Sequence, residues 1–102
     1  MPKAKVEILT PALNDIDRIA DYHLLAVGLI SAGIITDKLL DSIEKIGEFP
    51  LMGTEHSDAV LQKEGYRKLV CGEYICVYRL IDATVYIYRV VHGATNYPKL
   101  LR

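Results

Sequence analysis

Three runs rich in β-branched and aromatic residues lie between residues 65 and 92, separated by short turn-like breaks. This pattern predicts a three-stranded antiparallel meander. Gly72-Glu73 can close a two-residue hairpin with glycine at the first central position, and Asp82-Ala83 is the candidate for the second turn. Counting outward from these turns pairs residue 67 with 78 in the first hairpin. In the second hairpin it pairs 80 with 85, 78 with 87 and 76 with 89.

This register divides the side chains of the meander between two faces, neither of which is purely apolar. One face carries Arg67, Leu69, Cys71, Tyr74, Cys76, Tyr78, Ile87, Arg89 and Val91. The other carries Tyr66, Lys68, Val70, Ile75, Val77, Arg79, Tyr86, Tyr88, Val90 and His92. We therefore expect one face to pack on the rest of the chain and the other to form a partly apolar concavity that bears arginines.

The first half of the chain predicts a short strand followed by two helices. Residues 4–9 alternate weakly between apolar and polar, which indicates a strand that joins the meander. A helix should begin at Thr10, whose hydroxyl can cap the first turn, with Pro11 following, and it should end near Gly28. Its apolar stripe leaves Asp15 on the polar side. A second helix is expected from about residue 31 to 46, and the two should form a hairpin that covers one face of the sheet.

Residues 48–64 contain proline, glycine and polar residues without a sustained period, so we interpret them as a connecting loop. His56 lies in this segment and is expected to be solvated. The predicted order is strand, helix, helix, strand, strand, strand. This is an α+β fold in which a helical hairpin packs on a small, mainly antiparallel sheet, and residues 1–102 form one domain.

The charge and the cysteine content of the chain reduce the number of possible functions. The formal net charge is −1, whereas nucleic-acid-binding proteins normally carry an excess of basic residues that bind the phosphates. No long uncharged apolar stretch or signal-peptide pattern occurs, so we expect a cytoplasmic protein without a membrane span. Cys71 and Cys76 share a face diagonally, too far apart for an easy disulfide, and should be reduced buried thiols. No His or Cys set has metal-ligand spacing, so neither a metal site nor a cofactor is predicted.

The predicted order and four segments resemble the RelE/ParE superfamily of bacterial toxins from type II toxin-antitoxin pairs. The four segments are LTPALNDIDRIADY, IEKIGEFPLMGTE, GYRKLVCGEYICVYRL and VYIYRVVHGATNY. The resemblance implies a toxin that arrests growth and is neutralised by an antitoxin, whose C-terminal segment wraps across the helical hairpin and the sheet. It also implies one of two activities. RelE-like members cleave mRNA on the ribosome, and ParE-like members inhibit DNA gyrase.

Metal-free RNA cleavage needs a base, cations beside the phosphate and an acid for the leaving oxygen. Arg67 keeps one basic position of the RelE-like set. Leu69 and Ile75, however, occupy places where those members carry cations, and Ala94 lies near their arginine position after the last strand. Most of the cleavage set is therefore missing.

Two residues near the end of the chain leave a nuclease possible. His92 and Tyr97 could act as base and acid, with Arg67 or Arg89 holding the phosphate. In the alternative interpretation His92 is a strand-end residue bonded to the tail, and Tyr97 packs the tail onto the sheet. The segment RVVH with its short polar tail is closer to the ParE-like branch. By the predicted register Arg67 and Arg89 could also clamp a phosphate or an antitoxin carboxylate, or form structural ion pairs.

The sequence therefore predicts a ParE-like toxin that inhibits gyrase through protein contact, with enzymatic activity left open. The alternatives are a ribosome-dependent mRNA endonuclease and a degenerate member without toxicity. As contacts to the target or the antitoxin we predict Arg67, Arg79, Arg89 and Tyr78. Arg67, His92 and Tyr97 are the catalytic candidates for the nuclease alternative.

Overall fold

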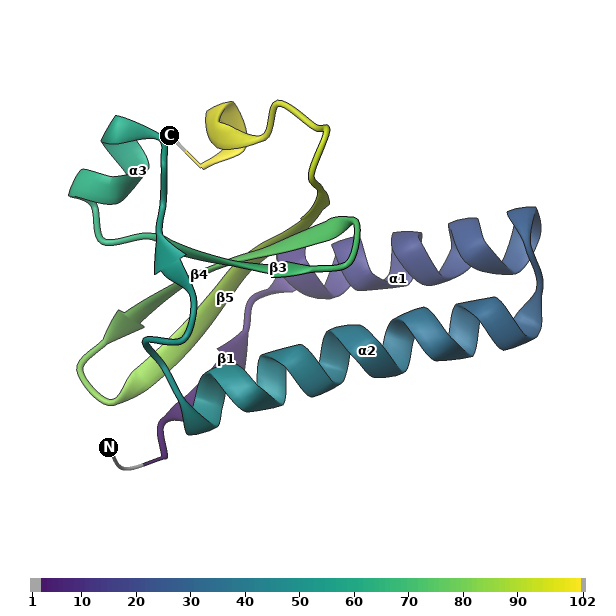
Figure 1. Cartoon of the computed structure of the whole chain (residues 1–102), viewed down its shortest axis with the longest axis horizontal. Coiled ribbons are helices and arrows are strands. Elements are labelled where there is room, and N and C mark those ends of the chain that lie inside the picture. Colours follow the sequence, from purple (N-terminus) through teal and green to yellow (C-terminus); the bar gives the residue numbers. More distant parts are fainter. Residues whose placement is uncertain (1–2, 102) are drawn as a thin grey trace.

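The computed structural model describes residues 3–101, in which two antiparallel helices cover one face of a five-stranded sheet (Figure 1). The elements in chain order are β1 (Lys5–Ile8), α1 (Thr10–Ala26), α2 (Leu29–Glu48), β2 (Thr54–Glu55), α3 (Ala59–Lys63), β3 (Arg67–Cys71), β4 (Tyr74–Ile81), β5 (Thr84–His92) and the 3₁₀ turn η1 (Pro98–Leu100). Within the sheet the order is β1-β5-β4-β3-β2, with β1 parallel to β5 and the other neighbours antiparallel. The predicted α+β fold with a helical hairpin is confirmed.

The helices α1 and α2 with their connection, residues 10–48, form an arm that extends past the sheet (Figure 1). The prediction that Thr10 caps α1 is wrong. The amide of Leu9 still donates to the carbonyl of Ile87 at 3.0 Å, so the chain stays extended through Leu9 and Thr10 is already helical. The connection between the helices is also shorter than predicted. Gly28 has a φ of 137°, which only glycine adopts readily, and α2 begins immediately after it.

The segment predicted as a loop contains β2 and α3. The carboxylate of Asp58 accepts hydrogen bonds from the amides of Val60 at 3.0 Å and Leu61 at 3.1 Å, which starts α3. Leu61 is fully buried and anchors this short helix to the sheet. Elements of two and five residues are too short to produce a recognisable period, and this explains the wrong prediction.

The predicted pairing holds for the first hairpin and for the first half of the second. Arg67 lies opposite Tyr78, and Tyr78 opposite Ile87. A bulge between Val77 and Tyr78 then shifts the register by one, so that Cys76 faces Val90 instead of residue 89. As a result Val90 faces the helices and Val91 the opposite side, the reverse of the predicted faces.

Both faces of the sheet are covered. Between the sheet and the helices lies the larger core, which includes Ile16, Leu39, Ile43, Ile46, Cys76, Tyr78, Val85, Ile87 and Val90. On the other face α3 and the C-terminal tail cover a smaller cluster of Leu61, Tyr66, Val77, Val91 and Tyr97. The prediction of an arginine-bearing concavity on one face is therefore only partly right, because α3 and the tail cover that face. Along residues 3–101 no helix has the length and apolar character needed to cross a membrane.

Candidate functional site

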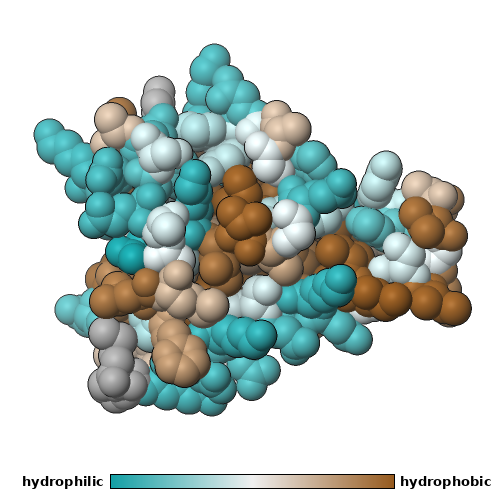
Figure 2. Space-filling view, viewed as in Figure 1, coloured by the Kyte–Doolittle hydropathy of each residue, from teal (hydrophilic) through white to brown (hydrophobic). Residues whose placement is uncertain are grey.

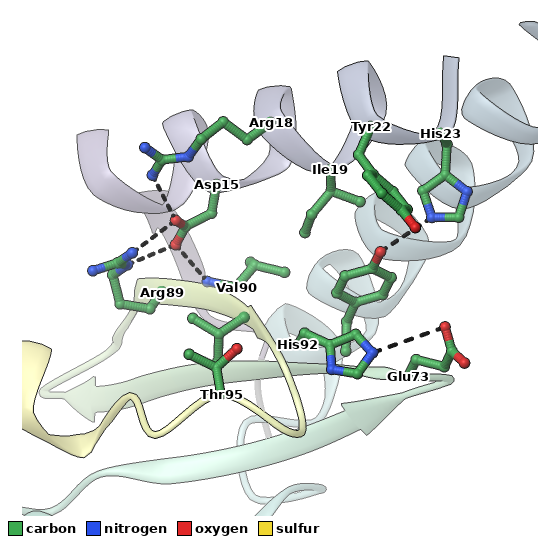
Figure 3. A pocket seen from close by; sticks show the side chains of 12 residues that line it. Asp15, Arg18, Ile19, Tyr22, His23, Glu73, Arg89, Val90, His92 and Thr95 are labelled. Carbon is green, nitrogen blue, oxygen red and sulfur yellow. Dashed lines mark hydrogen bonds and ion pairs between the residues drawn. The ribbon is translucent and has the colours of Figure 1, made fainter. Parts of the chain in front are cut away.

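A pocket of about 530 Å³ lies between α1 and the C-terminal half of β5 (Figure 3). It forms because β1 pairs only with residues 84–87 of β5. After β1 the chain continues as α1. Side chains of α1, in place of a neighbouring strand, therefore lie along the last residues of β5. Charged, aromatic and apolar groups meet there, from Asp15, Arg18, Ile19, Tyr22, His23, Glu73, Tyr74, Arg89, Val90, Val91, His92 and Thr95.

Asp15 is the centre of the polar contacts in this pocket. Its carboxylate accepts hydrogen bonds from Arg89 Nε at 2.7 Å and Nη2 at 2.8 Å, from the Val90 amide at 3.0 Å and from Arg18 Nη2 at 3.0 Å (Figure 3). Only 5% of Asp15 is exposed, so its predicted position on the polar side of the helix is wrong. Burial alone would raise the pKa of Asp15, but the bonds from Arg89, Val90 and Arg18 outweigh it and lower that pKa.

The Asp15 carboxylate binds two guanidinium groups, so one positive charge is left in excess at this side of the pocket. Arg89 is mostly buried, and its hydrogen bonds to Asp15 raise its pKa. Arg18 is largely exposed. A buried guanidinium beside an exposed one suits the binding of a carboxylate from a partner.

The other side of the pocket contains two histidines that contact Tyr74. His23 is hydrogen-bonded through Nδ1 to Ser31 at 3.0 Å and through Nε2 to Tyr74 at 3.1 Å, which ties α1, α2 and β4 together. His92 packs edge-on against Tyr74, and its Nδ1 accepts from the Ala94 amide at 3.1 Å. The interpretation of His92 as a strand-end residue bonded to the tail is thus confirmed.

Arg67 lies away from this pocket, under the segment that precedes β2. Its Nη2 donates to the carbonyl oxygens of Gly53 at 2.6 Å and Leu51 at 3.2 Å. Its Nε is buried and has no hydrogen-bond partner among the described residues. Arg67 and Arg89 therefore do not form the predicted clamp, because one holds backbone carbonyls and the other holds Asp15.

Tyr78 also has a structural role. It is fully buried, donates to the carbonyl of Pro50 at 2.9 Å and accepts from the amide of Gly53 at 3.0 Å. A Cβ atom at Gly53 would come within 2.6 Å of this hydroxyl, so the close approach requires glycine. The prediction that Tyr78 contacts a partner is wrong for this conformation, since no part of it reaches the surface.

Tyr97 packs the tail onto the opposite face of the sheet, where its hydroxyl meets His56 Nε2 at 2.6 Å. His56 is only 2% exposed, so the prediction of a solvated loop histidine is wrong. Its Nδ1 accepts from the Asp58 amide at 3.0 Å, which places the proton of the neutral ring on Nε2. Burial, with the nearby Lys68, lowers the pKa of His56, and burial with the nearby Asp58 raises the pKa of Tyr97.

Arg79 is the remaining predicted contact residue, and it lies on the face that carries α3 and the tail. Its guanidinium carbon is 5.0 Å from the centre of the Tyr66 ring and 5.9 Å from that of Tyr88. These cation-π contacts hold a half-buried guanidinium against two aromatic rings. Arg79 thus offers a partly accessible charge far from Asp15.

The side chains that the sequence analysis missed, Asp15 and His23, had a recognisable signal. Together with Ala12, Ile16 and Ile19 they follow helical spacing along the side of α1 that faces the sheet. A polar residue on such a stripe needs a buried partner. No comparable local signal identifies His56, whose partner is 41 residues away.

Thiol and metal chemistry find no support in the described part of the chain. Both cysteines are free, but Cys71 is only partly buried, so the prediction of two buried thiols is right for Cys76 alone. Burial, with a smaller contribution from Cys71, raises the pKa of Cys76 to about 12. Such a thiol stays protonated and unreactive. Within residues 3–101 no group of three or more His, Cys, Asp or Glu side chains could hold a metal ion.

Comparison with solved structures agrees with the architecture. A chain of the chromosomal ParDE toxin-antitoxin system from P. aeruginosa superposes with a TM-score of 0.75 and 16% identity, covering 88% of this chain and 96% of that one. A chain of the toxin-antitoxin complex RelBE2 from Mycobacterium tuberculosis gives a TM-score of 0.61 and 23% identity, covering 89% and 99%. At these identities the likeness establishes the fold.

Sequence comparison identifies the family. No curated protein sequence matches this chain significantly. The profile of the family described as "ParE toxin of type II toxin-antitoxin system, parDE" matches residues 6–97. Because the match spans nearly the whole chain, the protein belongs to the ParE family of type II toxin-antitoxin toxins.

Proposed function

We propose that this toxin arrests growth by binding DNA gyrase in the cytoplasm, and that a cognate antitoxin neutralises it. The main support is the separation of the groups that RNA cleavage would need. A cleavage site must bring a base, a cation and an acid within hydrogen-bond reach of one phosphate. Here the Tyr97 hydroxyl is bound to His56, Arg67 is bound to backbone carbonyls, and His92 lies in the pocket beside α1.

The chemical state of these groups supports the same conclusion. Burial raises the pKa of Tyr97, and its hydroxyl holds the tail against the sheet. Release of this hydroxyl as a catalytic acid would require the tail to detach. An inhibitor that acts by surface contact needs no such rearrangement. The mRNA endonuclease is therefore the second candidate, and loss of toxicity the third.

For the antitoxin, we propose that an acidic side chain enters the pocket beside Asp15. The excess positive charge of Arg18 and Arg89 provides the attraction, and Arg18 is exposed enough to move toward a ligand. The apolar and aromatic walls of the pocket, including Ile19 and Tyr22, would cover the stem of that side chain. Arg79, on the other face, is a further candidate for contact with either partner.

Two assays on the purified toxin test the proposed mechanism. In a supercoiling assay with gyrase we expect the activity to fall as toxin is added, and to recover when the cognate antitoxin is included. In a reconstituted translation reaction, primer extension should find the mRNA intact. Cut mRNA with unchanged supercoiling would overturn the proposal in favour of the endonuclease. No effect in either assay would favour a degenerate toxin.

Three variants connect the result to the structure. His92→Ala should keep full gyrase inhibition, whereas a nuclease using His92 as its base would lose cleavage. Arg18→Ala should weaken antitoxin binding by about tenfold, the effect of one charge-assisted contact. Asp17→Ala changes the neighbouring exposed residue and is the control for that measurement.

A further inference from the structure

The far end of the helical arm is an apolar surface without charges. The fifteen residues from Tyr22 to Thr36, which we call the arm tip, include no Asp, Glu, Lys or Arg. Figure 2 shows hydrophobic side chains gathered at this end of the arm, away from the sheet. Large apolar side chains of the tip are between 45% and 88% exposed, and they are Tyr22, Leu24, Leu25, Val27, Leu29, Ile30 and Ile34.

The tip is large enough to form an interface by itself. Seven side chains of this size and exposure present on the order of 800 Å², which is about what one partner buries in a standard protein-protein interface. Val27, Leu29, Ile30 and Ile34 also line a shallow hollow of about 660 Å³. A contiguous patch of this kind on a small protein marks a contact surface.

Charge around the tip identifies the kind of surface that fits it. Residues 10–48 contain seven acidic and three basic residues, a net charge of −4, whereas the rest of the chain has six acidic and nine basic residues, a net charge of +3. Exposed acidic side chains flank the tip on both helices, at Asp17, Asp21, Asp37 and Asp41. Nucleic acid and anionic lipid would be repelled by these carboxylates, and a second arm would bring the same acidic flanks together. A protein surface with an apolar centre and a basic border complements both features.

We propose that the arm tip is the surface with which this toxin binds gyrase, at an apolar site bordered by lysines and arginines near the DNA path of that enzyme. This inference rests on the proposed function. An enzyme that handles DNA must carry basic residues where the phosphates pass, so the acidic arm finds its complement there. The pocket beside Asp15, which meets the arm tip at Tyr22 and His23, then remains for the antitoxin.

Two double variants test the apolar centre and the acidic flanks separately. Leu25→Arg with Ile30→Arg places positive charge on side chains that are 88% and 81% exposed, so folding should be unaffected. Asp21→Lys with Asp37→Lys reverses the flanks. Val70→Arg, on a β3 side chain that is 64% exposed, and Glu48→Lys, at the sheet end of α2, are the matched controls.

The readout is the toxin concentration that halves gyrase supercoiling, measured at low and at moderate salt. Both double variants should raise this concentration by about tenfold or more, as expected for loss of interface hot spots, and the controls should leave it unchanged. For the wild type, added salt should also raise it, because opposite charges attract less strongly when screened.

Three results would overturn the inference. The first is full inhibition by both double variants. The second is loss of antitoxin binding in these variants with unchanged inhibition, which would assign the tip to the antitoxin. The third is that the wild type forms a dimer, and that the double variants are monomeric but inhibit gyrase as well as the wild type does. In all three the wild type still inhibits gyrase, so the proposed function stands. A wild type without any effect on gyrase would remove the proposed function and this inference together.

Discussion

The two ends of the helical arm differ in which side chains they bury. The root buries a carboxylate together with apolar side chains, whereas the tip leaves apolar side chains exposed. At the root, residues 10–21 and 37–48, Asp15 is buried and fully hydrogen-bonded, and Ile16, Leu39 and Ile43 pack into the core. At the tip, Leu25, Leu29 and Ile30 are exposed. The same pair of helices therefore contributes stability at one end and a free contact surface at the other. We therefore expect substitutions of the buried root side chains to change folding and substitutions of the exposed tip side chains to change binding.

Among the polar side chains of the arm, the largest effect on folding is expected from Asp15→Ala. This change leaves the Arg89 guanidinium and the Val90 amide without their acceptor. Removing one partner of a buried ion pair costs about 3 to 5 kcal/mol, and we expect about 3 because Arg89 still reaches solvent. Urea denaturation measures the loss. Asp17→Ala, two residues away and exposed, should change stability by less than about 0.5 kcal/mol.

A pH titration of stability, with Asp15→Asn for comparison, examines the charge of the same carboxylate. The pKa of Asp15 is lower in the folded protein than its ordinary value of 3.8. The unfolded chain therefore binds the proton first as the pH falls, so the contribution of Asp15 is complete above 3.8 and is lost below it. The free energy of unfolding should fall less steeply in this range for Asp15→Asn. Equal slopes for variant and wild type would contradict the assigned role.

A smaller effect is expected at His23, where root and tip meet. His23→Ala removes the hydrogen bonds to Ser31 and Tyr74 and should cost about 1 to 2 kcal/mol. In this variant, amide hydrogen exchange at the end of α1 should also be faster than in the wild type. Ser31→Ala removes one of the two bonds and should cost about half as much. If His23→Ala leaves both stability and exchange unchanged, the two hydrogen bonds of His23 do not hold the end of α1 in place.

The smallest effect on folding is expected at Leu29. Leu29→Ser at the tip should change stability by less than about 0.5 kcal/mol, because the side chain is already 77% exposed. Leu39→Ser in the same helix, at a fully buried position, should cost about 3 kcal/mol or more. Similar losses in the two variants would show that the tip is packed in solution, and the contrast between root and tip would not hold.

Local patterns in the sequence predicted the elements with strong periodicity. The two helices, both hairpin turns and the pairing next to each turn follow from spacing and turn residues, because the interactions that decide them lie within a few residues. Asp82 adopts a φ of 56° in the second turn, as a first central residue of such a turn requires. The order of the elements along the chain was predicted in the same way, whereas the order of the strands in the sheet, β1-β5-β4-β3-β2, was not.

The remaining features depend on residues far apart in the sequence. The bulge opposite Val77 changes which face Val90 and Val91 occupy, and no local pattern marks it. His56 becomes a buried partner of Tyr97 only because the tail folds back over α3 and the sheet. Of the predicted site residues, only Arg89 and His92 line the pocket, while Arg67 and Tyr78 hold the segment before β2.

Asp15 also has a consequence for the behaviour of the toxin at high concentration. The last residue of β1 lies opposite residue 87 of β5, so the rest of β5 would otherwise form an open edge of the sheet. An edge amide such as that of Val90 can pair with a strand from another molecule. Here the amide is bound to a buried carboxylate. The hydrogen bond that fixes α1 on the sheet therefore also opposes aggregation, since an incoming strand would have to displace a charged side chain.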